Sequence, residues 1–572
     1  MAHPRRRQDE RDEQDRIRES LRDILLILLI LSGNSAGHFW VGIGLLHKWR
    51  NPASPFGAVC ASVEPLSMNA TARRRSWFRR ILRILLWTAL ILLVLIVARC
   101  FYAFRDRSPG ADFVLNLDDR DARSQPRPLR VGFGRVKINP DLSDPARPVW
   151  LAGFDQHRAA TKIHDDLWAV ACVLDDGTRR LGLVVLDAIG LFHDDVLKVR
   201  RRLAPDWKIQ YAIVCTTHNH STPDLMGLWG PDYFHTGVDP RYQEQVIAAS
   251  VKALGDAVAA LQPARVAFHE IPTPPDGLVT DTRKPLVFDS DLRVMHFTNP
   301  TNDSTIGTVI NWGNHPETAW SRNTEITSDY CGYLRDALEH GVVQDGQVRE
   351  PGLGGVHLFV NGAVGGLMTT RPDVTVRDPY LNQDFQEPTH DKGRALGRQL
   401  FKRVRASLLN TNAPATDHAP ISIQARTVML PLDNLGFLLA PVLGLMDRGH
   451  AQWMKMRSEV ALVTFGDAAI ACVPGEIYPE IVNGGIERAP GGDFDIDPVE
   501  VPPIREFMPG KVKFLFGLAN DEIGYIIPKS EWDRKPPYLY GSEHGVYGEI
   551  NSVGPDTAGV IHAALREMSK PR

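Results

Sequence analysis

The feature that most constrains this chain is an uncharged apolar run from Ile84 to Ala98, which follows five arginines within residues 73–80. The run is shorter than the about 20 residues that cross a bilayer. It lengthens to a span of about 81–104 if Arg83 and Arg99 extend their side chains to the headgroups. Because basic clusters stay cytoplasmic, we expect a transmembrane signal-anchor and a single-pass protein whose folded region is periplasmic or extracytoplasmic. The alternative is a buried core helix.

The segment before this span has a different composition. Residues 1–80 are charge-dense or basic, and we expect them to be disordered apart from a second apolar stretch at 24–46. If that stretch also crossed the membrane, the arginine cluster would lie on the wrong side. The basic region that typically precedes an anchor begins only after Met68. Residues 1–67 are therefore a candidate upstream extension, with Met68 as the alternative start.

The rest of the chain has the composition of a globular protein. Net charge is -3, so no basic surplus points to nucleic acid. The six cysteines contain no C-x-x-C pair, which argues against a disulfide scaffold and a cysteine zinc site. Residues 105–128 are rich in charge, Pro and Gly and are expected to form a linker. A folded region is expected over 129–572.

Residues 129–572 alternate two kinds of pattern. Segments rich in Val, Ile and aromatic residues, such as 129–138 and 207–220, indicate strands or strand ends, whereas 241–261 and 390–409 have helical periodicity. Alternation without internal repeats predicts one large α/β domain, a layered sandwich with mixed sheets. Several strands end in polar motifs, where α/β folds place their sites.

The most specific of these motifs is an H-x-H pair, His218 and His220, at the end of an apolar strand. In an extended chain, residues i and i+2 point to the same side, so both imidazoles can share one cavity. Such a pair is a usable half-site for zinc. The alternative is a hydrogen-bonded turn with exposed histidines.

Other candidates are weaker when taken singly. His164 precedes a strand, Glu476 follows one in V-P-G-E, and Tyr525 lies within one. Each has an ordinary alternative role, as a structural histidine, a helix cap and a packing residue respectively. His315 and Asp329 lie in N-W-G-N-H-P-E and T-S-D. A phosphate loop, a G-x-S-x-G nucleophile elbow and H-E-x-x-H are all missing from the sequence.

The order and spacing of these motifs resemble the catalytic domain of the neutral, non-lysosomal ceramidase family. The resemblance covers most of 129–572. It rests on seven segments in the family's order: RVGFGRVKI, KIHDDL, VVLDAIG, TTHNHSTPD, NWGNHPE with the later TSD, VPGE, and NDEIGYIIPKSEW.

The resemblance implies one zinc ion per chain, which the family holds with two histidines, a glutamate and a tyrosine. The corresponding residues here are His164, His220, Glu476 and Tyr525. It also implies catalytic roles for His218 as a proton shuttle or oxyanion donor, for His315 and Asp329 behind the ligands, and for Tyr525.

One departure from the family bears on mechanism. The family's G-D-V-S-P-N segment carries a serine proposed as catalytic, whereas residues 365–370 read G-G-L-M-T-T. Methionine cannot act as an acyl nucleophile, so hydrolysis is expected to use metal-activated water directly. The tyrosine of the family's R-Y-E-G segment has only loose counterparts in Tyr538 and Tyr540, and the family's Ig-like domain is not expected.

The resemblance therefore implies a membrane-anchored zinc amidohydrolase that cleaves ceramide-like N-acyl lipids to a fatty acid and a sphingoid base. Two alternatives stay open. One is a zinc hydrolase of another amide or ester on the same scaffold. The other is a catalytically inactive lipid-binding relative.

Overall fold

The computed structural model describes residues 68–410, 413–545 and 547–570. The chain divides into two units, Met1–Val97 and Ala98–Arg572. The second apolar stretch at 24–46 and the rest of 1–67 lie outside the described residues. Within them, one segment, Trp77–Ala103 of helix α2 (Met68–Ala103), is long and apolar enough to cross a membrane. The expected apolar helix ahead of the folded region is thus confirmed.

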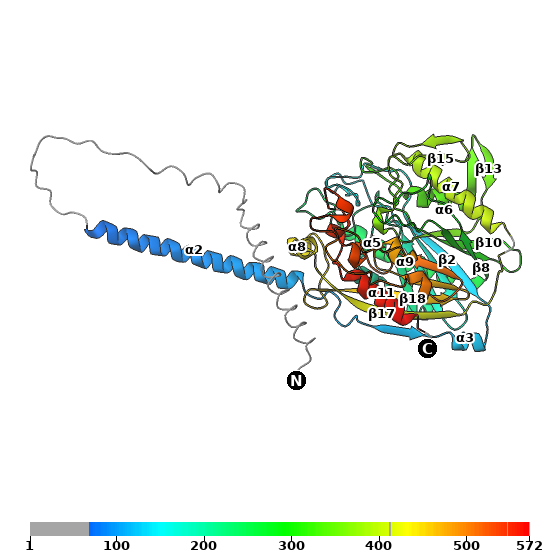
Figure 1. Ribbon diagram of the computed structural model, residues 1–572, viewed down its shortest axis with the longest axis horizontal. Coiled ribbons are helices and arrows are strands. Elements are labelled where there is room, and N and C mark those ends of the chain that lie inside the picture. Colours follow the sequence, from blue (N-terminus) through cyan, green and yellow to red (C-terminus); the bar gives the residue numbers. More distant parts are fainter. Residues whose placement is uncertain (1–67, 411–412, 546, 571–572) are drawn as a thin grey trace, which may run out of the picture. The chain divides into compact units, whose positions relative to one another are not determined.

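Unit 2 (Ala98–Arg572) is built on three mixed sheets (Figure 1). In each sheet one pair of neighbouring strands is parallel and the other pairs are antiparallel. The parallel pairs are β5/β6 in the first sheet, β10/β14 in the second and β19/β21 in the third. The first sheet has the order β6 (Tyr211–Thr216), β5 (Arg180–Leu186), β4 (Trp168–Asp175), β2 (Arg130–Lys137) and β7 (Gln262–Pro263). The second has the order β14 (Val356–Asn361), β10 (Thr305–Trp312), β9 (Leu292–Thr298) and β8 (Arg265–Ile271). The third has the order β1 (Val114–Leu117), β17 (Ile421–Pro431), β18 (Lys455–Phe465), β19 (Ala468–Cys472) and β21 (Val512–Phe516).

The main core lies among these sheets. Phe133 of β2 contacts Phe297 of β9 with ring centroids 5.9 Å apart, and Phe297 in turn contacts Phe465 of β18 at 6.2 Å. All three rings are buried in one cluster with alternate residues of β4, β5, β17 and β19. Burial of this apolar area is the main force that holds the sheets together.

Helices cover the other faces of the sheets and complete the layers (Figure 1). The first sheet packs against α5 (Pro240–Ala259), the second against α6 (Asp329–His340) and α7 (His390–Leu408), and the third against α11 (Thr557–Met568). The predicted α/β layered sandwich with mixed sheets is confirmed.

Shorter helices are α3 (Arg120–Ser124), α4 (His193–Arg201), α8 (Leu435–Leu443), α9 (Pro479–Asn483) and α10 (Ile504–Phe507). Two-stranded pairs are β3 (Lys162–Ile163) with β11 (Glu325–Ile326), β12 (Gly341–Gln344) with β13 (Gln347–Pro351), β15 (Val376–Asp378) with β16 (Gln383–Phe385), and β20 (Glu476–Ile477) with β22 (Tyr525–Ile526).

Residues 105–128 are not a free tether in this structure. Strand β1 pairs antiparallel with β17, with Val114 opposite Arg426, and so forms the edge of the third sheet. Arg457 of β18 donates to both carboxylate oxygens of Asp106 at 2.7 and 2.8 Å. The charged residues that suggested a linker are therefore used to attach this segment to the folded unit.

Candidate metal centre and cavity

The candidate site lies where strands of all three sheets end. His218 and His220 follow β6, His315 follows β10, and Glu476 begins β20 soon after β19. An isolated bridge between Cys215 of β6 and Ala519, just after β21, joins two of these ends. The polar motifs at the strand ends thus share one region, as expected for an α/β fold.

Three buried histidines form the centre of this region. One nitrogen from each of His218, His220 and His315 lies within 4.8 Å of the others. Their ring centroids are 4.8–5.4 Å apart. His218 has a left-handed backbone, with φ of 64°, so the H-x-H pair converges through a turn and not through the extended chain that the sequence suggested. A strained backbone at a buried polar residue is typical of functional sites.

The hydrogen bonds of His218 and His315 fix the orientation of their rings. His218 Nδ1 lies 2.9 Å from the Ile189 carbonyl oxygen, and His315 Nδ1 lies 2.7 Å from that of Met368. A carbonyl only accepts, so each Nδ1 carries a proton, and each Nε2 is the nitrogen turned toward Glu476. These two Nε2 atoms lie 3.3 and 3.0 Å from Oε2 of Glu476.

His220 is held in a similar way by a carboxylate. Its Nδ1 lies 2.9 Å from Oε2 of Glu317, whose other oxygen accepts a short hydrogen bond from the Thr369 hydroxyl. Its Nε2 is buried and has no hydrogen-bond partner among the described residues. Metal-binding histidines usually make such an outward bond from the second ring nitrogen. The donor set of three imidazoles and a carboxylate therefore fits a zinc ion.

Glu476 carries the negative charge at the centre of the site. Burial opposes its ionisation, but the charges of and hydrogen bonds from His218 and His315 hold its pKa well below the usual range. The same contact with Glu476 overcomes burial and raises the pKa of His218. Burial lowers the pKa of His220 to about 4, which keeps this imidazole neutral and able to bind a cation.

The histidines open onto a cavity of about 590 Å³. Its walls are largely apolar. Glu522 also faces the cavity: Oε1 accepts from the Gly524 amide at 2.8 Å, and Oε2 is buried without a hydrogen-bond partner among the described residues. The apolar lining is formed by Phe154, Ile189, Phe192, Met226, Leu228, Trp229, Trp320, Phe437, Met446, Met456 and Ile523.

His164 is not brought to this site, which corrects the expectation that it shares an ion with His220. Pairing of β3 with β11 places it beside Glu325 instead, with Nδ1 3.4 Å from Oε2. Its ring stacks on His390 with centroids 3.7 Å apart and planes only 9° apart. Lone pairs in parallel rings do not converge on one point, so the arrangement of this group (His164, Glu325, His390) is poor for holding a metal.

Tyr525 and Asp329 occupy different positions relative to the cavity. Tyr525 pairs with Glu476 between β22 and β20 and lines the cavity. Burial and the charge of Glu476 raise the pKa of Tyr525 well above its usual value, so it is a neutral phenol here. Asp329 lies behind the site and accepts from the Thr318 amide and hydroxyl at 2.9 Å. It thereby supports the turn that carries Glu317.

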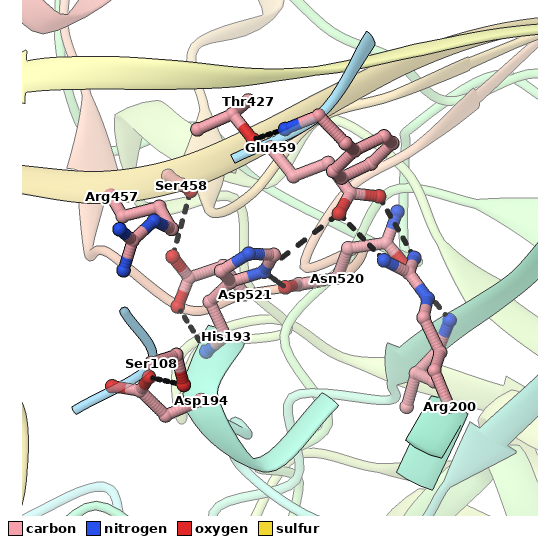
Figure 2. A network of polar contacts seen from close by, with 12 residues as sticks. Ser108, His193, Asp194, Arg200, Thr427, Arg457, Ser458, Glu459, Asn520 and Asp521 are labelled. Atoms are coloured by element: carbon pink, nitrogen blue, oxygen red, sulfur yellow. Dashed lines mark hydrogen bonds and ion pairs between the residues drawn. The ribbon is translucent and has the colours of Figure 1, made fainter. Parts of the chain in front are cut away.

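A buried polar network fixes the chain just before Glu522 (Figure 2). Arg200 donates to both carboxylate oxygens of Glu459 at 2.6 and 2.8 Å and to Asn520 Oδ1 at 3.0 Å. Asp521 accepts from the His193 amide at 2.9 Å and from the Ser458 hydroxyl at 2.7 Å. The network thus joins α4 and β18 to the segment that carries the cavity-lining residues.

The segment 365–370 contributes to the site through its backbone and through Thr369. Met368 is fully buried, and its carbonyl accepts from His315. The Thr369 hydroxyl donates a hydrogen bond to the Glu317 carboxylate. This segment therefore orients two groups of the site.

Comparison with known proteins agrees with this architecture. Neither a protein-family model nor a curated protein matches the sequence. The structure matches that of neutral ceramidase from Pseudomonas aeruginosa with a TM-score of 0.57 and 17% sequence identity, over 77% of this chain and 74% of that one. The chain has the neutral ceramidase fold. A structure described as a ceramidase complexed with C2 matches equally well, with a TM-score of 0.57, 16% identity, and coverage of 77% and 75%.

On this neutral ceramidase fold, Glu317 is expected to act as a positioning residue for His220. Replacing Glu317 by Ala removes the outward partner of Nδ1 and should weaken the binding of a metal ion at the three histidines, tested with zinc, by about 10–100-fold. Competition titration with a zinc chelator measures this. The matched control is Glu317→Gln, whose amide oxygen still accepts from Nδ1 and should restore most of the affinity. Equal affinities for Glu317→Ala and the wild type would contradict the role.

Proposed function

We propose that this chain is a zinc-dependent amidohydrolase, anchored to a membrane by α2, that cleaves the amide bond of ceramide-like N-acyl lipids. The proposal is carried by one observation above all: three buried imidazoles meet, and the Nδ1 atoms of His218 and His315 face backbone carbonyls while that of His220 lies 2.9 Å from Glu317. The neutral ceramidase fold supports the reaction class. The products would be a fatty acid and a sphingoid base.

His218, His220 and His315 would hold the ion, with Glu476 as the nearest carboxylate. Bound zinc supplies a Lewis acid and lowers the pKa of a coordinated water to about 7. Compared with the set expected from the resemblance, His315 takes the place of His164, His218 takes the place of Tyr525, and His220 and Glu476 are kept.

The remaining residues would handle protons and position the substrate. Burial, together with the charge of Glu476, raises the pKa of Glu522 well above its usual value, so its carboxyl holds a proton inside the cavity. A protonated carboxyl there is suited to donate to the amine as the C–N bond breaks, while water adds to the carbonyl carbon. The Tyr525 hydroxyl is a neutral donor beside Glu476 that can bind a substrate oxygen. The apolar walls would bind the acyl chain and exclude water.

The experiment that tests this function is a substrate panel run on the full chain in detergent. Wild type should hydrolyse N-acyl sphingoid lipids, and Glu476→Ala should lose at least about a hundredfold in kcat/KM, because the carboxylate contacts two of the proposed ligands. The matched control is Glu325→Ala, a carboxylate beside two histidines outside the cavity, which should keep wild-type activity.

Two outcomes would contradict the proposal. Turnover of short-chain esters without turnover of N-acyl lipids would indicate another hydrolase on the same scaffold. A zinc-loaded wild type that turns over neither would favour the lipid-binding alternative. The Met368 segment motivates this second outcome, because it offers no serine nucleophile.

A further inference from the structure

Helix α8 is an apolar helix that the folded unit covers only in part. Its nine residues, LGFLLAPVL, include no charged or polar side chain. Only Ala440 and Pro441 are buried. A helix that is apolar on all sides normally lies inside a protein core or a membrane. Here the remaining seven residues are half-buried apart from Gly436 and Leu443, which are exposed, and Leu443 is 40% exposed.

A groove beside α8 extends this apolar surface. It has a volume of about 370 Å³ and is lined by Leu439 and Leu443 of α8 together with Tyr233, Tyr547 and Ile550. Tyr233 and Ile550 are 73% and 63% exposed. Exposed apolar residues that gather in this way mark a surface that binds a partner or a membrane.

The groove lies next to the cavity that holds the histidines. Leu228, Trp229, Phe437, Tyr547 and Asn551 line both. Phe437 belongs to α8, so this helix forms part of the wall of each. A wall formed largely by apolar and aromatic side chains therefore separates the exposed groove from the cavity of the candidate metal centre.

The end of the apolar helix α2 is fixed to α8 within unit 2. Arg99 donates from Nε to the Val442 carbonyl at 2.7 Å and from Nη2 to the Pro441 carbonyl at 2.8 Å. Phe104 stacks on His450 at 4.6 Å and contacts the edge of Trp453. The last residues of the candidate membrane span thus lie against α8 and the loop that follows it.

The residues around this attachment are those that favour a membrane–water boundary. Trp453 is 67% exposed. The guanidinium of Arg105 lies 3.8 Å from the centre of the Tyr102 ring, and those of Arg99 and Arg107 lie at 5.5 and 5.7 Å. Tyr, Trp and Arg concentrate at the headgroup level of membrane proteins. A bilayer is therefore the occupant that this surface fits.

We infer that α8 and its groove are seated in the headgroup and acyl boundary of the bilayer that α2 spans, and that the lipid passes from this bilayer through the groove into the cavity. The inference rests on the proposed function for the identity of the lipid. It adds a route by which an insoluble substrate reaches the site without crossing water.

The test measures the depth of α8 in a membrane and requires no catalysis. In a background with Cys60 and Cys100 replaced by Ser, the remaining cysteines are buried. Leu443→Cys is labelled with an environment-sensitive fluorophore, and the full chain is reconstituted in phosphatidylcholine vesicles. The control is Val348→Cys on β13, which is 64% exposed and lies at the other end of unit 2 from α8 (Figure 1).

We expect the label at 443 to shift to shorter wavelength and to be quenched by lipids that carry a nitroxide on the acyl chain, whereas the label at 348 does neither. Equal, water-like spectra at both positions would overturn the inference. So would a shifted label at 443 that lipid-borne nitroxide does not quench, because a second copy or another protein would then cover α8.

A second variant tests whether lipid reaches the cavity from the surface around α8. Leu443→Asp places a charge where the bilayer is proposed to lie and should lower the ratio of vesicle-lipid turnover to turnover of a monomeric short-chain amide at least tenfold. Val348→Asp should leave that ratio unchanged, and an unchanged ratio in Leu443→Asp would overturn the route. If neither substrate is hydrolysed while the label at 443 is quenched, the proposed function fails and the membrane surface stands.

Discussion

Replacing His220 by Ala should leave the purified chain without zinc and lower kcat/KM for an N-acyl lipid by about a thousandfold. His220 Nε2 is buried and has no hydrogen-bond partner among the described residues, so it is a nitrogen left to bind the ion. Loss of a bound ion removes several kcal/mol of charge stabilisation in the transition state, and about 1.4 kcal/mol corresponds to a factor of ten in rate. Metal analysis and steady-state kinetics on the same preparations measure both effects.

The matched control is His164→Ala. His164 is also a histidine beside a carboxylate, but it stacks on His390 outside the cavity. This variant should keep one zinc per chain and near wild-type activity. If His164→Ala lost zinc and His220→Ala kept it, the ligand set inferred from the geometry would be wrong.

The second large effect is expected from Glu459→Ala, which should lower the free energy of unfolding by about 3–5 kcal/mol. Glu459 is fully buried, and its loss leaves the charge of Arg200 with neutral acceptors such as the Ala212 carbonyl at 2.8 Å and Asn520 Oδ1 at 3.0 Å. Urea unfolding of the full chain in detergent, followed by tryptophan fluorescence, measures the change. Asp495→Ala, which breaks an exposed pair with Arg488, is the control and should cause no measurable loss.

The same pair predicts how stability depends on pH. Burial alone would raise the pKa of Glu459, but the charge of and hydrogen bonds from Arg200 hold it below its usual 4.5. A lowered pKa in the folded state means that the stabilisation is fully present above the unfolded-state pKa and is lost as pH falls through the folded-state value. The difference between wild type and Glu459→Ala should therefore be constant from about pH 6 to 8 and shrink below about pH 4.5. A difference that grew on acidification would contradict this.

The sequence predicts the parts of the fold that depend on local patterns. Strand β6 is apolar throughout and ends in polar residues, so its place at the edge of a site follows from pattern alone. The place of Glu476 at the edge of a site likewise follows from its position after the apolar strand β19. The apolar helix of α2 is equally local, because its length and composition define it.

The position of His164 could not be predicted in this way. Which ring meets which depends on β3 pairing with β11 and on α7 presenting His390, contacts between segments more than a hundred residues apart. The motifs keep the family's order along the chain, but this order does not determine which side chains contact one another in the fold. His315 shows the reverse, since its Nε2 lies among the proposed ligands and not behind them.

Glu317 and Glu522 were missed for a different reason. Glu317 lies two residues after His315 in N-H-P-E, and Glu522 lies three before Tyr525, so a search of each motif for every carboxylate would have found both. Only the fold shows that their oxygens face a histidine and a cavity instead of water. Residues 105–128 have a composition typical of linkers, but part of this segment pairs with β17 and belongs to the third sheet.

The most direct test of the central claim is anomalous X-ray scattering at the zinc edge from crystals of the zinc-loaded chain. The account predicts one peak per chain, within about 2.0–2.1 Å of Nε2 of His218, His220 and His315. A peak between His164 and His390, or none at the three buried histidines, would contradict it.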